Sequence, residues 1–433
     1  MSIKQDNIDM TRVGPGTVMG NFMREYWIPA AKSSELDNDG TPMRLMLLGE
    51  KLIAFRDSSG RVGVMDHLCP HRCASLVLGR NEENGIRCIY HGWKFDVDGN
   101  CVEMPSVAPS QDFKEKVKAK AYKAVDRNGI IWVYMGPKKQ PPPLPKIEAT
   151  LLLESEVEIS FTQRDCNWLQ ALEGDIDTSH FGFLHVGHLD PDNVPAGHPL
   201  EHTASERAPE YHVSDAPWGT TYGAYRTVRP ETTYWRFANY MFPFWTQTPQ
   251  GEFPINIQAR AWVPLDDEHV MMIFWRTKSL GGGTAQPLKD GKPLGGSKPQ
   301  PEYLPISTEW LGRYRVKANE SNDWLIDREA QRTNRIYSGI DNIGLQDQAV
   351  TESMGAITNH ELEHLGPGDL MISRTRRRAL KAARAFQEGN AAPGVDQPEI
   401  LKEARSGYFE AHESVEWQKG YADQMSAAKR VIS

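Results

Sequence analysis

Short apolar runs broken by turn residues fill the chain between residues 44 and 136. They cover residues 45–48, 52–55 and 95–97, and each is followed within a few positions by glycine or by a group of polar residues. Apolar runs of this length that are bounded by turn residues are typical of β-strands. Residues 129–134 add a last strand of the same kind. The pattern predicts a small all-β module in this part of the chain.

A proline-rich stretch, residues 137–145, follows that last strand. Proline fixes φ and lacks an amide hydrogen, so the stretch suits neither a helix nor a central strand. A chain of 433 residues is also longer than one core usually fills. We therefore predict two domains, residues 1–145 and residues 146–433.

After the proline-rich stretch, which we call the hinge, apolar residues recur both with the period of a strand and with the period of a helix. This pattern predicts an α+β domain built on an antiparallel sheet. Strands are expected at 156–163, 220–228, 233–241, 255–263 and 270–277, and helices near 166–181, 307–334, 370–388 and 408–429. Residues 281–301 are rich in Gly, Pro and Lys, which predicts a mobile surface insertion.

Charge and cysteine content narrow the function classes. The net charge of −8 argues against nucleic acid as a partner. The basic run 374–378 lies in a predicted helix and is most simply a solvated face; a docking surface for an acidic partner is the alternative. Neither a membrane-spanning run nor a signal peptide is recognisable. Three of the five cysteines lie outside the metal-ligand motifs described next, and an odd number argues against a set of disulfides. These features favour the reducing cytoplasm.

Two mixed pairs of cysteine and histidine stand out in the β-rich part: Cys69-Pro70-His71 and, after sixteen intervening residues, Cys88-Ile89-Tyr90-His91. In a Rieske [2Fe–2S] centre two thiolates bind one iron and two imidazoles bind the other, which raises the potential to between about −150 and +300 mV. Two cysteines and two histidines also suit zinc, but zinc fingers usually pair cysteine with cysteine and histidine with histidine. The mixed pairs favour a Rieske cluster that relays electrons.

Asp177, His180 and His185 offer a carboxylate and two imidazoles in the second half. With one more carboxylate, such residues form the two-histidine, one-carboxylate triad of non-haem Fe(II) oxygenases. On a continuous helix His185 would lie about 140° from His180, so the helix must end or distort, plausibly at Gly182. Taken alone, these histidines are more simply core residues. An electron relay needs a terminal acceptor, however, which favours an iron site.

At these residues the chain resembles the Rieske non-haem iron aromatic-ring hydroxylating oxygenases, and among them the phthalate 4,5-dioxygenase-like oxygenase components. The likeness covers nearly the whole chain. It is carried by Cys69-Pro70-His71-Arg72, residues 88–93, Asn167-Trp168-Leu169-Gln170, residues 173–180 with His185, and residues 346–355.

The resemblance implies a ligand set and an assembly. His180, His185 and Asp347 would bind a mononuclear Fe(II), with Asp175 and Asp341 as replacement candidates. Asp177 would accept hydrogen bonds from His180 and from a cluster histidine, His91, of a neighbouring subunit. This requires a closed ring, a homotrimer or a hexamer of stacked trimers. An all-β Rieske domain followed by an α+β catalytic domain of the helix-grip type is expected.

The resemblance also implies a reaction. Electrons from NADH would pass through a separate flavin and iron–sulfur reductase to the cluster, and O2 would be added to an aromatic carboxylate as a cis-dihydrodiol. Phthalate, isophthalate and related benzoates are the candidate substrates. A carboxylate in an apolar pocket needs a fixed cation, and arginine suits it.

Arg207 is our preferred substrate contact, with Ser179 as a second donor. The other candidates are Arg226, Arg236 and Arg260. Each of these arginines is at least as easily a surface or ion-paired side chain. The aromatic run 242–245 is equally consistent with a pocket wall and with plain core.

Three alternative functions are compatible with parts of the sequence. Residues 360–364 match the H-E-x-x-H zinc signature, but Gly366-Pro367 ends any helix at once, so structural duty is favoured. A Rieske monooxygenase or O-demethylase would use the same ligands with a different pocket. A pure electron-transfer protein would need no second iron site, which argues against it here.

Overall fold

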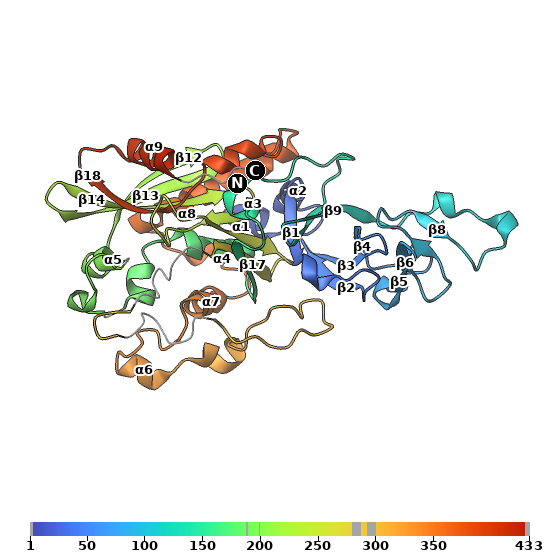
Figure 1. Ribbon diagram of the computed structural model, residues 1–433, viewed down its shortest axis with the longest axis horizontal. Helices are drawn as coiled ribbons and strands as arrows, with labels where there is room; N and C mark the ends of the chain where they lie inside the picture. Colours follow the sequence, from blue (N-terminus) through green and yellow to red (C-terminus); the bar gives the residue numbers. More distant parts are fainter. Residues whose placement is uncertain (1–2, 188, 199, 279–286, 292–299, 429–433) are drawn as a thin grey trace.

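The computed structural model describes residues 3–187, 189–198, 200–278, 287–291 and 300–428. Figure 1 shows two β-rich parts along the longest axis, with the N-terminal strands at one end and a larger sheet with its helices at the other. Strands within the sheets pair antiparallel. This confirms the predicted α+β class.

The N-terminal part is built from two antiparallel sheets. Six strands follow the order β1-β10-β9-β4-β3-β2, and four short strands follow the order β5-β6-β7-β8. Their bounds are β1 Trp27–Lys32, β2 Met43–Leu47, β3 Glu50–Arg56, β4 Val62–Asp66, β5 Arg80–Glu82, β6 Gly85–Arg87, β7 Lys94–Phe95, β8 Cys101–Glu103, β9 Ala121–Arg127 and β10 Ile130–Tyr134. The small sheet projects furthest from the rest of the chain (Figure 1). The strands predicted before the hinge are confirmed to within a few residues.

One large sheet organises the second part, in the order β11-β17-β16-β15-β14-β13-β12, with β18 also paired to β14. Its strands are β11 Val157–Arg164, β12 Glu210–Ala216, β13 Gly219–Arg229, β14 Thr232–Met241, β15 Trp245–Gln247, β16 Gln258–Pro264, β17 Val270–Thr277 and β18 Gly407–His412. The five strands predicted here are all present. The β14 strand is buried along almost its whole length because it lies inside the sheet.

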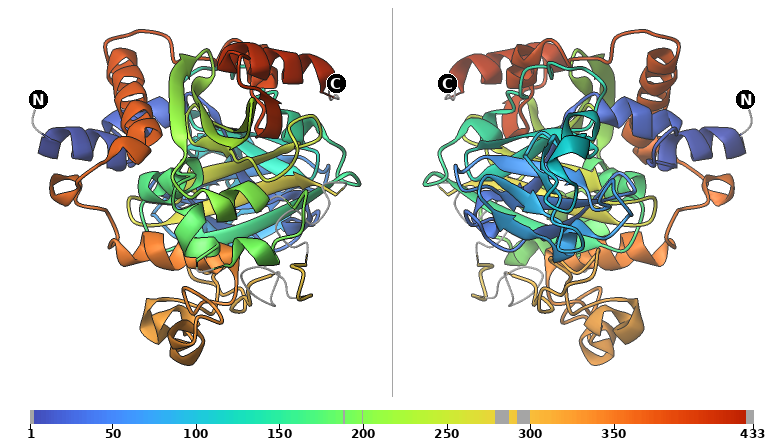
Figure 2. Two further views of the ribbon diagram at one scale, coloured as in Figure 1. Left: turned by 90° about the vertical axis from the view of Figure 1, so that its left-hand side faces the viewer. Right: turned by 90° about the vertical axis from the view of Figure 1, so that its right-hand side faces the viewer.

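Helices cover this sheet and its edges (Figure 2). They are α1 Ile3–Thr11, α2 Val18–Arg24, α3 Glu148–Leu151, α4 Trp168–Ile176, α5 Glu201–Ser205, α6 Arg328–Arg332, α7 Ile343–Ser353, α8 Leu370–Gln387 and α9 Trp417–Ala427. The predicted helix at 370–388 is confirmed as α8, which lies beside α1, α2 and β13. None of the described helices has the long apolar run that crossing a bilayer requires.

The two parts share apolar packing across the hinge. Trp132 of β10 stacks on Trp245 and Trp275 of the large sheet, with ring centroids 5.9 and 6.3 Å apart. Within the second part, just after the hinge, the carboxylate of Glu148 pairs with Arg405 in a fully buried, two-pronged contact. Across the hinge, the stacked tryptophans pack β10 directly against the large sheet.

Some predicted elements are wrong. Most of the described chain from 307 to 334 is irregular, and only α6 and a short 3₁₀ segment at Glu320–Leu325 are helical. Residues 408–412 belong to strand β18, and helix α9 begins later. The segments β12 and α7 lacked a clear period and were not predicted. The insertion predicted at 281–301 lies mostly outside the described residues.

Candidate metal centres

Two loops in the N-terminal part carry the predicted cluster ligands, one after β4 and one between β6 and β7. In each loop the amide four residues after the cysteine donates to the cysteine carbonyl: Cys73 N to Cys69 O and Gly92 N to Cys88 O, both at 2.9 Å. The residue at this fourth position has positive φ in both loops, 57° and 75°. The two loops therefore repeat one tight turn, and Cys73 is a turn residue.

The four predicted ligands lie together at these turns. Cys69 and Cys88 are 2% and 3% exposed and lie within hydrogen-bonding reach of each other. The rings of His71 and His91 are 4.4 Å apart between centroids, and Trp93 stacks on His71. His91 Nδ1 is buried without a hydrogen-bond partner among the described residues. A buried imidazole nitrogen without a partner, in loops that also carry two neighbouring buried thiols, fits a Rieske cluster.

Protonation of the metal-free loops follows from their burial. Burial, and to a smaller extent the neighbouring Cys88 thiol, raise the pKa of the Cys69 thiol to about 11. Cys69 is therefore protonated at neutral pH before the cluster is bound. Because the thiolate is the iron ligand, cluster binding releases this proton.

The chain around His180 breaks the helix, as the spacing of the histidines requires. The α4 helix ends before Asp177, whose backbone is extended, and one turn of π-helix follows His180. Val186 N donates to Phe181 O at 3.2 Å, an i to i+5 bond. Since a π turn takes up more residues than an α turn, His180 and His185 come to lie on the same side. The helix ends earlier than predicted, while Gly182 lies within the π turn.

Helix α7 brings Asp347 to these two histidines. Asp347 Oδ1 lies 3.0 Å from His185 Nε2 and 3.5 Å from His180 Nε2, and the two imidazole nitrogens are 3.2 Å apart. All three ligand atoms thus lie close enough to contact one ion. Two imidazoles and one carboxylate on one side of an ion are the donor set of non-haem Fe(II) oxygenases. The residues present fit a mononuclear iron.

Hydrogen bonds to the other ring nitrogens orient both imidazoles. His185 Nδ1 lies 2.7 Å from Gln346 Oε1, and Gln346 Nε2 donates to Ile340 O at 2.9 Å. His180 Nδ1 lies 3.5 Å from Asp177 Oδ2. Such contacts fix the tautomer that leaves Nε2 for a metal. The sequence offered Gln346 only as part of a motif, and its role as the partner of His185 emerges from the structure.

Charge is concentrated at the triad. Burial alone would lower the pKa of His180, but the carboxylates of Asp177 and Asp347 outweigh it and raise that pKa to about 10. Burial would raise the pKa of Asp347, and the two histidines hold it well below its usual range. The metal-free site is therefore an ion-paired cluster at neutral pH.

The two replacement candidates differ in position from Asp347. Asp175 accepts hydrogen bonds from Thr246 Oγ1 at 2.6 Å and Trp262 Nε1 at 3.1 Å, and it pairs with Arg260. Asp341 does not join the group of candidate ligands found among the described residues. The geometry favours Asp347.

The predicted substrate contacts flank the triad. Ser179 Oγ lies 2.5 Å from the hydroxyl of Tyr211. Arg207 is half-buried; its guanidinium lies 5.6 Å from the Phe183 ring centroid and donates to Leu189 O at 3.5 Å. Arg260 pairs with Asp175, as described above. Arg226 and Arg236 are both buried in the large sheet.

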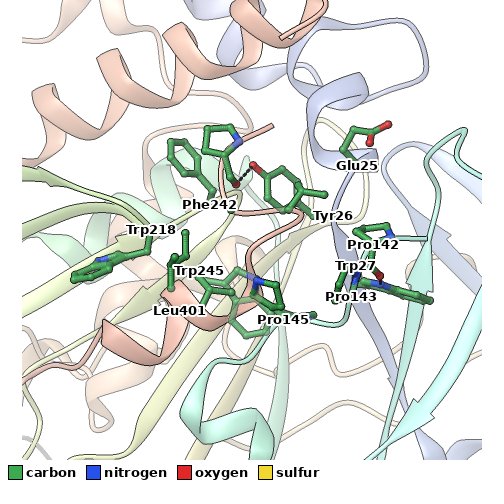
Figure 3. Close-up of a pocket in the computed structure, with 15 residues that line it drawn as sticks. Glu25, Tyr26, Trp27, Pro142, Pro143, Pro145, Trp218, Phe242, Trp245 and Leu401 are labelled. Atoms are coloured by element: carbon green, nitrogen blue, oxygen red, sulfur yellow. Dashed lines mark hydrogen bonds between the residues drawn. The ribbon is translucent and has the colours of Figure 1, made fainter. Parts of the chain in front are cut away.

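The aromatic run 242–245 belongs to the core beside the hinge. Figure 3 shows Phe242 and Trp245 lining an apolar crevice together with prolines of the hinge, among them Pro142 and Pro145. No residue of the triad lines this crevice. Of the two interpretations, plain core is therefore favoured over a substrate-pocket wall.

The H-E-x-x-H match does not form a zinc-protease site. Residues His360–Leu362 form a short 3₁₀ turn and Glu363 is extended, so His360 and His364 do not share a helix. Glu363 and the buried Glu173 both pair with Arg376. Because the Arg376 guanidinium pairs with both carboxylates, the geometry favours a structural ion-pair network at this second cluster.

The basic run 374–378 is largely paired within the chain. Arg374 and Arg378 both contact Asp215, and Arg376 binds the two glutamates described above. Arg377 is the exposed arginine of this run. The run therefore anchors α8 to its neighbours, and its charge offers little to an acidic partner.

Comparison with known proteins bears on both centres. Residues 26–122 match the family described as Rieske [2Fe-2S] domain, and residues 133–431 match the family described as LigXa C-terminal domain like. The fold is similar to that of a solved dicamba monooxygenase, with a TM-score of 0.54 and 16% identity over 86% of this chain and 100% of that chain.

Curated relatives match over almost the full length. The chain is 52% identical to the 3-chlorobenzoate-3,4-dioxygenase oxygenase subunit of Comamonas testosteroni, over 99% of this chain and 100% of the relative. It is 34% identical to the phthalate 4,5-dioxygenase oxygenase subunit of Pseudomonas putida, over 96% and 94%. With a Rieske domain, a converging iron triad and these relatives, the chain belongs to the Rieske non-haem iron aromatic ring-hydroxylating oxygenases, which are oxidoreductases that use a [2Fe–2S] cluster and iron.

Proposed function

We propose that this chain is the oxygenase component that cis-dihydroxylates an aromatic carboxylate with O2 and electrons supplied from NADH by a separate reductase. The observation that carries the proposal is the convergence of His180, His185 and Asp347 in a chain that also holds a Rieske domain. A relay and a terminal acceptor are then both present. A pure electron-transfer role would leave the triad without a purpose.

We propose specific ligands for each centre. Cys69, His71, Cys88 and His91 hold the cluster, supported by their shared burial and by the orphaned His91 nitrogen. The triad holds the mononuclear iron, supported by its 3.0 to 3.5 Å spacings. The bound iron supplies activation of O2. The two domains are residues 1–145 and 146–433, in keeping with the two family matches.

The residues of the chain perform the positioning. Asp177 and Gln346 hold the two imidazoles with Nε2 toward the ion. His185 is almost fully buried, so it would exclude bulk water from its side of a bound ion. A fixed ligand geometry favours productive use of O2 over loss of electrons to solvent.

Electron transfer between subunits follows from the shape of the chain. Figure 1 places the small sheet that carries the cluster loops at one end, away from α4 and α7. The cluster of one chain is thus poorly placed to serve its own iron. Beside the cluster ligands, Ile89 and Tyr90 are 60% and 54% exposed, which is unusual for large apolar side chains. We propose that this tip docks on a neighbouring copy in a homotrimer or hexamer, with Asp177 bridging His180 and the neighbour's His91.

The substrate class is proposed from the relatives and from the site. The two relatives described above are named for aromatic carboxylates, 3-chlorobenzoate in one case and phthalate in the other. A chlorobenzoate or benzoate is favoured over phthalate because the chlorobenzoate relative is the more similar of the two. Arg207 and Ser179 remain the contacts proposed from the sequence.

A single-turnover experiment tests the function. Chemically reduced protein is mixed with ¹⁸O2 and with 3-chlorobenzoate, benzoate, phthalate, isophthalate and phenoxybenzoate in parallel. We expect a dihydrodiol carrying two labelled oxygens from one of these acids. One labelled oxygen, or loss of a methyl group from a methoxybenzoate, would instead support a monooxygenase or O-demethylase. Oxidation of the cluster with no labelled product from any acid would contradict the proposal.

A further inference from the structure

Two buried arginines lie on the sheet face that carries Tyr211. Arg226 on β13 is 3% exposed and Arg236 on β14 is 6% exposed. The register pairs Arg226 with Tyr234 and Ala224 with Arg236, so the two arginines are diagonal neighbours on one face. Buried guanidinium groups in proteins are almost always paired with an acid.

Neither guanidinium pairs with a carboxylate among the described residues. Arg226 Nε donates to the backbone oxygen of Glu206 at 2.6 Å, whereas its Nη1 is buried without a partner. Arg236 Nε is likewise buried without a partner. The pair therefore carries two positive charges whose donors are not used up by the chain.

Acids near the two arginines form no ion pair with them among the described residues. The charge of Glu206 acts on Arg226, but its carboxylate accepts from the Ala208 amide. Glu410 pairs with His202 and with Arg229. Asp177 faces His180 at the triad. Burial first, and then the neighbouring charge of Arg236, lower the pKa of Arg226 to about 10. In the absence of an anion, this region thus holds an uncompensated positive charge.

The arginines adjoin the triad through aromatic side chains. The Arg236 guanidinium lies 5.1 Å from the ring centroid of Phe181, and that ring lies 5.2 Å from the ring of His185. On the same face, the Tyr211 hydroxyl contacts Ser179, the residue before His180. The buried hydroxyl of Tyr222 lies on the same face, with Thr178 beside it. The guanidinium donors of Arg226 and Arg236 thus lie near the proposed iron ligand His185, with the Phe181 ring between Arg236 and His185.

We propose that Arg226 and Arg236 together bind the carboxylate of the aromatic substrate and so fix which edge of the ring faces the iron. This inference rests on the proposed function. It assigns the anion site to the two arginines that form no ion pair with a carboxylate among the described residues. Arg207 is half-buried and its guanidinium already contacts Leu189 O and the Phe183 ring.

Equilibrium binding to the intact, oxidised oxygenase tests the proposal without turnover. Calorimetry compares 3-chlorobenzoate with its neutral analogue 3-chlorobenzamide in the wild type and in Arg226→Met, Arg236→Met and Arg207→Met. Arg229→Met, an exposed arginine of the same strand, is the matched control. We expect Arg226→Met and Arg236→Met each to weaken binding of the acid roughly ten- to a hundredfold, with the amide changed less than about twofold.

Thermal unfolding separates a binding role from a structural one. Removing an uncompensated buried charge should leave the ligand-free melting temperature unchanged or raise it. Equal loss of acid and amide binding together with a lower melting temperature would mean a structural role and overturn the proposal.

Two further outcomes would also overturn it. In the first, the acid binds the wild type but keeps its affinity in both sheet variants, or loses it only in Arg207→Met. In the second, the wild type binds no aromatic acid yet oxygenates a neutral aromatic compound. That result would remove the acid substrate while leaving the oxygenase chemistry intact.

Discussion

At the scale of single residues, side chains outside the triad orient its two imidazoles. Asp177 and Gln346 each contact the far nitrogen of an imidazole, and Gln346 is itself held by a backbone carbonyl. Partners of this kind commonly change metal affinity or activity by about 10- to 100-fold. The family resemblance implied the role of Asp177, and its spacing from His180 is compatible with that role. The sequence could not reveal the partner of His185, which is brought in by a helix far along the chain.

Replacing Asp177 with asparagine tests this role. Asp177→Asn keeps the size of the side chain but removes the negative charge facing His180, so we expect product formation to slow by about 10- to 100-fold. The cluster content should be unchanged. Stopped-flow oxidation of the cluster in the presence of substrate and O2 measures the rate. Asp423→Asn, on the exposed side of α9, is the matched control, and equal rates in both variants would contradict the role.

At the scale of elements, tight turns and helix breaks place the ligands. The cluster loops use a positive φ at their fourth position, and the π turn aligns two histidines five residues apart. The sequence predicted the helix break because a regular helix would have separated the histidines. It did not predict α7. Polar residues such as Gln346, Gln348 and Thr351 are buried in this helix, so its buried face is not marked by apolar residues at helical spacing.

Other elements were beyond sequence reasoning for a related physical reason. The strand β18 was taken for the start of a helix because it is short, and its role appears only when it pairs with β14 far back in the chain. The stretch 307–334 has the residue spacing of a helix, yet tertiary contacts hold most of its described part in an irregular path.

Gly92 offers a test of the cluster loop. Its φ of 75° costs an L-residue about 1–2 kcal/mol, and a Cβ there would lie 2.6 Å from Pro105 Cγ. Gly389 has a φ of 93° but nothing within 4 Å of its Cβ position. We therefore expect Gly92→Ala to lower both the melting temperature and the visible absorbance of the cluster. Gly389→Ala should lower the melting temperature only through backbone strain and leave the absorbance of the cluster unchanged. Equal loss of absorbance in both would contradict this account of the loop.

At the scale of the whole molecule, the small sheet beside the cluster loops lies at one end of the chain, away from α4 and α7 (Figure 1). Stacked tryptophans pack the N-terminal part against the large sheet across the hinge. This shape supports the proposal that electrons pass from the cluster of one subunit to the iron of a neighbour, which would make oligomerisation part of catalysis.

Mixing two inactive chains tests the transfer between subunits. A Cys88→Ser chain lacks the cluster and an Asp347→Ala chain lacks the iron, so homo-oligomers of either should be inactive. Co-expressed oligomers should recover a measurable fraction of wild-type turnover, because some clusters would face an intact iron in the neighbour. Mixed oligomers that are identified by native mass spectrometry but remain inactive would contradict the arrangement.

The most direct measurement of the central claim is the iron and sulfide content of purified chains. We expect about three irons and two sulfides per wild-type chain. Asp347→Ala should keep about two irons and both sulfides and lose oxygenated product, while Asp341→Ala, the alternative carboxylate, should keep all three irons. A third iron that survives in Asp347→Ala, or is lost in Asp341→Ala, would show that the triad of His180, His185 and Asp347 is not the site of oxygenation.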